Sequence, residues 1–124
     1  QKDERIIFIA PTNHVKSLIE QSYCLLSYPT IPHAILPIAE AVYLGTPVIS
    51  ADTPEAKEYS NNGKAAILFE MNNKEAFQKA INYTLENGEK LNRIIKKGTK
   101  IIQIIFDPIA NSKLLDNIYQ KILD

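Results

Sequence analysis

The chain has 124 residues, and its 14 Lys and Arg balance 14 Asp and Glu, so the formal net charge is zero. That length suits a single domain, over residues 1–124, with a core of its own. The balanced charge argues against a nucleic-acid binder, which would carry a basic excess or a basic stripe. The single cysteine, Cys24, excludes an internal disulfide and fits a reducing compartment. No apolar run reaches the length of a membrane span, and "QKDER" is not typical of a signal peptide, so the sequence predicts a cytoplasmic protein.

Short apolar runs alternate with helical patterns along the first part of the chain. Residues 5–10, "RIIFIA", form a continuous apolar run that predicts a strand buried on both faces. Apolar residues at helical spacing predict a helix over 14–23, for which Asn13 is a suitable N-cap. A second strand is expected over residues 24–28, and an apolar helix follows from about residue 34 to residue 44.

The second part of the chain continues the alternation and ends in helices. Gly45 stands in the usual position after a helix, and Pro47 suits the start of the next strand. Pro54 lies near the first turn of a short helix, and Asn73 is placed to cap a longer one. The expected elements are a strand over 48–50, a helix over 54–60, a strand over 65–70, and helices over 74–87, 88–105 and 108–123.

Strands that alternate with helices imply crossover connections and a parallel sheet. The sequence therefore predicts an α/β fold with a Rossmann-like parallel sheet of about four strands and flanking helices. Ligands of such folds bind outside the carboxyl ends of the strands. The loops at those ends are residues 10–13, 28–34 and 50–54, where Ser50, Asp52 and Thr53 lie, although Asp52 also suits a helix cap.

Residues 90–100, "KLNRIIKKGTK", form the most basic segment. Its spacing predicts the polar face of an amphipathic helix, which is an ordinary feature of soluble proteins. Association with a membrane surface is the alternative, because apolar side chains lie close to the cations. These are Ile94, Ile95, Ile101, Ile102 and Ile104.

Residues 36–70 carry the most specific pattern. "LPIAEAVYLGTPVISADTPEAKEYSNNGKAAILFE" resembles the later part of the donor-binding domain in retaining, nucleotide-sugar-dependent glycosyltransferases of the two-domain GT-B class, the group 1 family. In that family a motif close to Leu-Pro-x-x-Glu-Ala-x-x-x-Gly-x-Pro-Val-Ile joins the nucleotide-binding helix to the next strand. The flanking segments are similar too, over nearly the whole chain. The motif is matched by Leu36, Pro37, Glu40, Ala41, Gly45, Pro47, Val48 and Ile49.

The resemblance implies a donor site in which two glutamates are separated by seven residues. Glu40 matches the second, which would accept hydrogen bonds from the ribose hydroxyls, as an ionised carboxylate can. The first would bind the donor hexose, but its place falls on Pro32 or His33, and neither is a carboxylate. The family's glycine-rich turn, whose backbone amides approach sugar and phosphate, is represented by His33, Ala34 and Ile35. The nucleotide end of the site is therefore retained, and the hexose end is altered.

Other polar residues near the strand ends are candidates for the same site. His33 could donate to a sugar hydroxyl or a phosphate, or be only a loop residue between prolines. Thr30 could contact phosphate or form a turn, and Thr12 could border the base. With two histidines, one cysteine and no acidic cluster, the sequence predicts no metal site and no cofactor.

The resemblance implies transfer of a sugar from a nucleotide-sugar to an acceptor hydroxyl, as in polysaccharide biosynthesis. The family's acceptor-binding domain has no counterpart here, so we expect part of a longer enzyme or one subunit of a split one. We also expect the isolated chain to be inactive, with no catalytic residue of its own. The alternatives are a non-catalytic module that binds a partner subunit, and another GT-B enzyme such as a sugar-nucleotide epimerase. The parent enzyme could lie at the inner face of the membrane.

Overall fold

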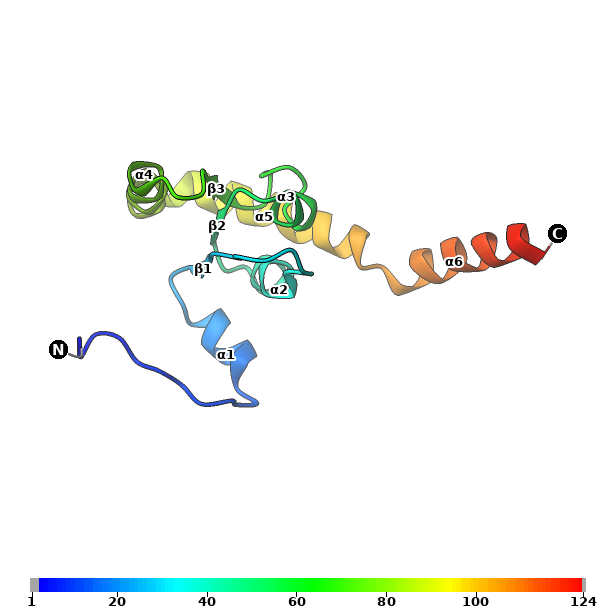
Figure 1. The fold of residues 1–124 in the computed structure, drawn as a ribbon, viewed down its shortest axis with the longest axis horizontal. Coiled ribbons are helices and arrows are strands. Elements are labelled where there is room, and N and C mark those ends of the chain that lie inside the picture. The colour runs from blue at the N-terminus through cyan, green and yellow to red at the C-terminus, as the bar shows by residue number, and fades with distance from the viewer. Residues whose placement is uncertain (1–2, 124) are drawn as a thin grey trace.

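The computed structural model describes residues 3–123. Its centre is a parallel sheet with the strand order β1-β2-β3, as Figure 1 shows. Leu25 lies opposite Val48 in the first pairing, and Ile49 lies opposite Ile67 in the second. The predicted α/β class with a parallel sheet is confirmed. The strands are β1 (Leu25–Ser27), β2 (Val48–Ala51) and β3 (Ile67–Phe69).

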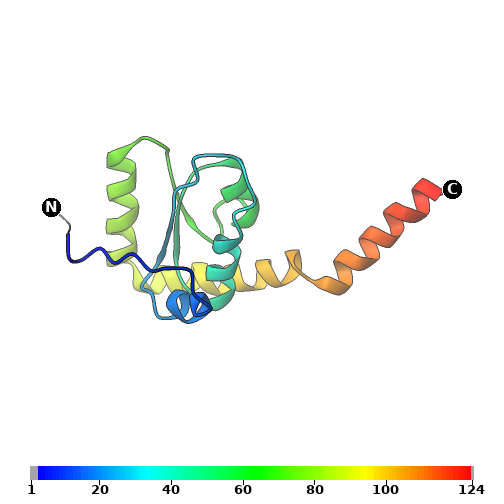
Figure 2. The same cartoon turned by 60° about the horizontal axis from the view of Figure 1, so that its bottom comes forward.

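Helices cover both faces of this sheet. Figure 2 shows α4 on one side of the strands and α2 and α3 on the other. Helix α2 also packs against α1 and α5, whereas α6 extends away from the body (Figures 1 and 2). No helix within residues 3–123 combines the length and the apolar character that crossing a membrane requires. The helices are α1 (Val15–Glu20), α2 (Leu36–Leu44), α3 (Pro54–Tyr59), α4 (Lys74–Glu86), α5 (Gly88–Ile105) and α6 (Pro108–Leu123).

The strand expected over residues 5–10 is wrong: these residues form no ladder in the described chain. The segment runs away from the sheet, and Phe8 within it is 82% exposed (Figure 1). The sheet therefore has three strands rather than about four. An apolar run indicates that a segment needs burial on both faces, but it does not supply the neighbouring strand with which to pair.

Two predicted helix caps are replaced by neighbouring residues. Asn13 does not cap α1, whose N-cap is His14 without a side-chain bond. Asp52 does not cap α3, because the Thr53 hydroxyl accepts from the backbone N–H of Ala56 at 3.1 Å. Both errors are of one position, within the usual uncertainty of helix ends.

Other predicted helix ends are confirmed by their geometry. The Asn73 side chain accepts from the backbone N–H of Ala76 at 2.9 Å, which satisfies one donor of the first turn of α4. Gly45 ends α2 with φ of +83°, a conformation that costs glycine little. Pro54 occupies the first turn of α3, where its missing N–H would have no helical partner.

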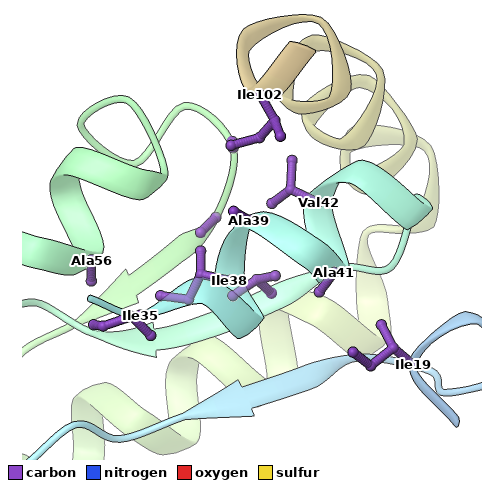
Figure 3. Packing of buried hydrophobic residues seen from close by; sticks show 11 residues of the cluster. Ile19, Ile35, Ile38, Ala39, Ala41, Val42, Ala56 and Ile102 are labelled. Atoms are coloured by element: carbon purple, nitrogen blue, oxygen red, sulfur yellow. The ribbon is translucent and has the colours of Figure 1, made fainter. Parts of the chain in front are cut away.

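Helix α2 occupies the centre of the core. Its side chains at Ile38, Ala41 and Val42 are fully buried, and Figure 3 shows Ile102 of α5 beside Val42. All four residues of β2 are buried as well, as expected for the central strand. A smaller cluster, around Ile49, Phe69 and Ala80, fills the space between the sheet and α4.

Helix α5 crosses α2 at Gly98. A Cβ atom added there would lie 2.7 Å from Val42 Cγ1 and 2.9 Å from Ala65 Cβ, closer than van der Waals contact. The neighbouring Thr99 hydroxyl donates to the backbone carbonyl of Val42 at 3.1 Å. The absence of a side chain at Gly98 therefore permits the close approach and fixes which face of α5 is turned inward.

We predict that Gly98→Ala lowers the free energy of unfolding by about 1–2 kcal/mol, because the overpacking outweighs the gain in helix propensity. Urea denaturation followed by circular dichroism measures the change. Gly88→Ala is the matched control, because nothing lies within 4 Å of a Cβ atom there. If the two variants were equally stable, the close approach of α5 to α2 would be wrong.

Candidate functional site

The carboxyl ends of the three parallel strands lie at one edge of the sheet, and the described structure joins them by hydrogen bonds. Tyr28 directly follows β1. Its hydroxyl donates to Asn72 Oδ1 at 3.0 Å and accepts from the Asn72 backbone N–H at 3.2 Å. The Tyr28 ring stacks on Phe69, with ring centroids 6.1 Å apart. Tyr28 therefore ties the end of β1 to the loop after β3.

The residues that follow β2 form the start of α3 and make contacts that hold it in place. The Asp52 carboxylate pairs with Lys57 at 2.9 Å, and its backbone N–H donates to the carbonyl of Phe69 at 2.7 Å. Thr53 is buried as the N-cap, and the Ser50 hydroxyl, also buried, donates to the carbonyl of Ala51. The polar side chains at the end of β2 and in the loop after it therefore have structural partners.

A hollow of about 460 Å³ opens at the same edge, beside the start of α4. Aromatic rings and Leu26 form its apolar part, and Lys74 contributes its one formal charge. Leu26 of β1 is 52% exposed, so its side chain is accessible in this hollow. The hollow is lined by Leu26, Tyr28, Phe69, Asn72, Asn73, Lys74 and Phe77.

Glu40 lies on the exposed face of α2. The inward face of this helix is set by buried residues at positions 38, 39, 41 and 42, so position 40 must point to solvent. Within residues 3–123 the Glu40 carboxylate has no ion pair and no hydrogen bond. It is the one charged residue of α2.

Two hollows meet at Glu40. The first, of about 370 Å³, lies between α1 and α2 and is lined also by Lys16 and Tyr43. The second, of about 290 Å³, lies between α2 and the end of α5 and is bordered by Tyr43 and Phe106. The carboxylate and the Tyr43 ring, which is 57% exposed, are therefore both accessible to a molecule lying along α2.

The other predicted site residues lie in the loops before α1 and α2. His33 is exposed, and its Nδ1 lies 2.8 Å from the carbonyl oxygen of Ile31. Thr30 and Ala34 are exposed, but Ile35 is 3% exposed and packs in the core near Ala56 (Figure 3). The side chain of Ile35 therefore belongs to the core, and its predicted role rests on its backbone.

Thr12 has a local partner, because its hydroxyl oxygen accepts from the backbone N–H of His14 at 3.2 Å. No hydrogen bond within residues 3–123 joins Glu40 to Thr12, Thr30 or His33. The grouping of these residues around one ligand stays a prediction.

Four residues near the candidate sites were missed from the sequence. Tyr43 could have been found, because positions 36, 40 and 43 share one face of a helix. Lys16 and the Tyr28–Asn72 bridge could not, since both depend on contacts between segments distant in the chain.

Cys24 is unsuited to nucleophilic chemistry. Burial raises the pKa of its thiol, so less of the reactive thiolate is present near neutral pH. It packs with the cluster beneath α4. Residues 3–123 also contain no group of three or more His, Cys, Asp or Glu side chains placed to hold a metal ion.

Comparison with known families gives a match to the family described as glycosyl transferases group 1, over residues 2–101. The chain belongs to this family. The match includes α2 and Glu40 and ends within α5, so α6 lies outside it. No curated protein matches the chain. Membership in the family supports a role in glycosyl transfer.

We predict that Tyr28→Phe lowers the free energy of unfolding by about 1 kcal/mol, because both of its hydrogen bonds to Asn72 are lost. Thermal unfolding measures the effect. Tyr43→Phe is the control, since the Tyr43 hydroxyl has no hydrogen bond within residues 3–123 and should change stability little. Equal effects of the two substitutions would contradict the bridge between β1 and β3.

Proposed function

We propose that this chain binds the nucleotide part of a nucleotide-sugar donor in a retaining glycosyltransferase of the GT-B class. The observation that carries the proposal is the Glu40 carboxylate, which is exposed on α2 between two hollows and has no partner within residues 3–123. The family match covers this position, and the motif around it resembles the family's nucleotide-binding helix.

The chemistry of Glu40 and its neighbours suits a nucleoside. An ionised carboxylate can accept hydrogen bonds from two vicinal ribose hydroxyls. The Tyr43 ring lies beside the same hollows and offers an aromatic face on which a base can stack. Lys16 has only a long contact to Glu20, 3.8 Å, which leaves its ammonium group available to phosphate.

In the complete enzyme, a hexose would pass from the diphosphate to an acceptor hydroxyl with retention of configuration. Catalysis of this kind depends on positioning the reactants and stabilising charge on the departing diphosphate. We propose that an acceptor-binding domain or a partner subunit supplies the remaining groups of the active site. The isolated chain would therefore transfer no sugar. Neither a metal nor another cofactor would be needed. We propose a cytoplasmic location, where nucleotide-sugars would serve as donors. His33, Thr30, Thr12 and the backbone of Ala34 and Ile35 would contact the donor from the adjoining loops.

A non-catalytic module is the second candidate. Pro32 and His33 stand where the family has its hexose-binding glutamate, so the hexose end lacks a carboxylate. The exposed apolar side chains of Leu36 and Tyr43, which flank Glu40, would then contact a partner protein. This candidate differs from the first in predicting no affinity for nucleotides.

We predict that UDP, GDP or ADP binds the chain and that Glu40→Gln weakens the binding about 10- to 100-fold, the cost of losing hydrogen bonds to a charged acceptor. Isothermal titration calorimetry measures the affinity, and amide NMR shifts locate the ligand. The amide of glutamine keeps the size of the side chain, so a loss of folding does not explain the result.

Glu86→Gln removes the same charge from the exposed end of α4 and should leave the affinity unchanged. Equal loss in both variants would indicate a general electrostatic effect instead of a ribose contact. A folded chain that binds none of the three nucleotides would refute the first candidate and favour the second.

A further inference from the structure

The charges of the chain balance overall but are unevenly distributed. Helix α5 contains five of the 14 basic residues and a single acidic one, Glu89. The helix therefore carries an excess of positive charge that the rest of the molecule offsets elsewhere. The basic residues are Lys90, Arg93, Lys96, Lys97 and Lys100.

The packing of α5 turns these cations outward. Its buried positions are Leu91, Gly98 and Ile102, which face α2 and the core. Positions 90, 93, 97 and 100 follow the i, i+3, i+7, i+10 spacing of one helix face, and position 96 lies beside it. All five side chains are exposed. At 1.5 Å per residue they form a stripe about 15 Å long, which we call the basic face.

The basic face is not neutralised by the described parts of the molecule. None of its five cations forms an ion pair within residues 3–123, where the ion pairs involve Arg5, Lys16 and Lys57. Asp107 lies beyond the end of α5, and its carboxylate accepts from the backbone N–H groups of Ile109 and Ala110. Glu89, four residues before Arg93, is the one acid of α5, so the helix keeps an excess of four positive charges.

An exposed apolar side chain continues the basic face at its carboxyl end. Ile104 follows Lys100 by one turn on the same stripe and is 74% exposed. The Phe106 ring, at the C-cap of α5, stacks on Tyr59 with ring centroids 6.0 Å apart, which ties this end of the helix to the body of the protein.

We propose that the basic face of α5 binds an anionic lipid surface, with Ile104 entering between the headgroups. A row of cations followed by an apolar side chain matches the two layers of such a surface, phosphate outside and acyl chains beneath. A nucleic acid fits less well, because it would leave Ile104 in water and finds no aromatic ring among the five cations. Glu40 borders the other side of α5, near Ile102, so the proposed nucleotide site stays accessible.

The test compares two variants that each remove two positive charges. Lys97→Gln with Lys100→Gln alters the basic face, whereas Lys64→Gln with Lys79→Gln alters exposed lysines outside α5. Binding is measured by sedimentation of the full chain with phosphatidylcholine vesicles containing about 30% phosphatidylserine. We expect the first variant to bind on the order of tenfold more weakly than the unmodified chain, and the second to differ little. Circular dichroism checks that each variant is folded.

Two further measurements separate this proposal from its rivals. Ile104→Ser should weaken binding to the same vesicles several-fold without changing the charge, because one apolar side chain no longer enters the acyl layer. An equal loss in both lysine variants, or no preference for phosphatidylserine over pure phosphatidylcholine, would overturn the proposal. So would binding to duplex DNA in the absence of binding to vesicles.

Discussion

The fold depends on the burial of α2 between the parallel sheet and α5. This helix is nine residues long, too short to be stable alone, so its stability comes from packing on both sides. Small residues make that packing close: Ala39 and Ala41 face inward from α2, and Gly98 removes the side chain of α5 at the crossing. Burial of Ile38 and Val42 contributes about 1.5–3 kcal/mol for each side chain.

The same constraint explains most of the family motif without any ligand. Ala41 is fully buried, Gly45 has a left-handed backbone, and Pro47 precedes the central strand. Val48 and Ile49, in that strand, are both buried. Glu40 differs from them, because no contact within residues 3–123 requires a carboxylate there. A charged residue that the packing does not need, within a motif that the packing otherwise accounts for, favours a binding role.

The sequence predicts those parts of the structure that depend on local interactions. The apolar helix expected over about 34–44, its end at Gly45 and the cap at Asn73 follow from local pattern and residue type, and the structure confirms them. The segment 5–10 could not be placed in this way, because a strand exists only with a neighbour and the pattern does not name one. The hollow shared by Lys16, Glu40 and Tyr43 likewise could not be predicted from the sequence, since it forms where α1 packs on α2.

The two faces of α5 differ in burial and in charge although their residues alternate in the sequence. Lys97 and Gly98 are adjacent, yet the first is exposed and the second meets Val42 of α2. The inner face therefore supports the helix that presents Glu40, and the outer face is free to vary in charge without disturbing the core. A solvated face needs only polar residues, and a mixture of both signs would serve, as it does on most soluble helices. Five cations against a single acid, Glu89, exceed that requirement, and an apolar end at Ile104 opposes it. Solubility alone accounts for neither feature, and both motivate the proposed contact with an anionic lipid surface.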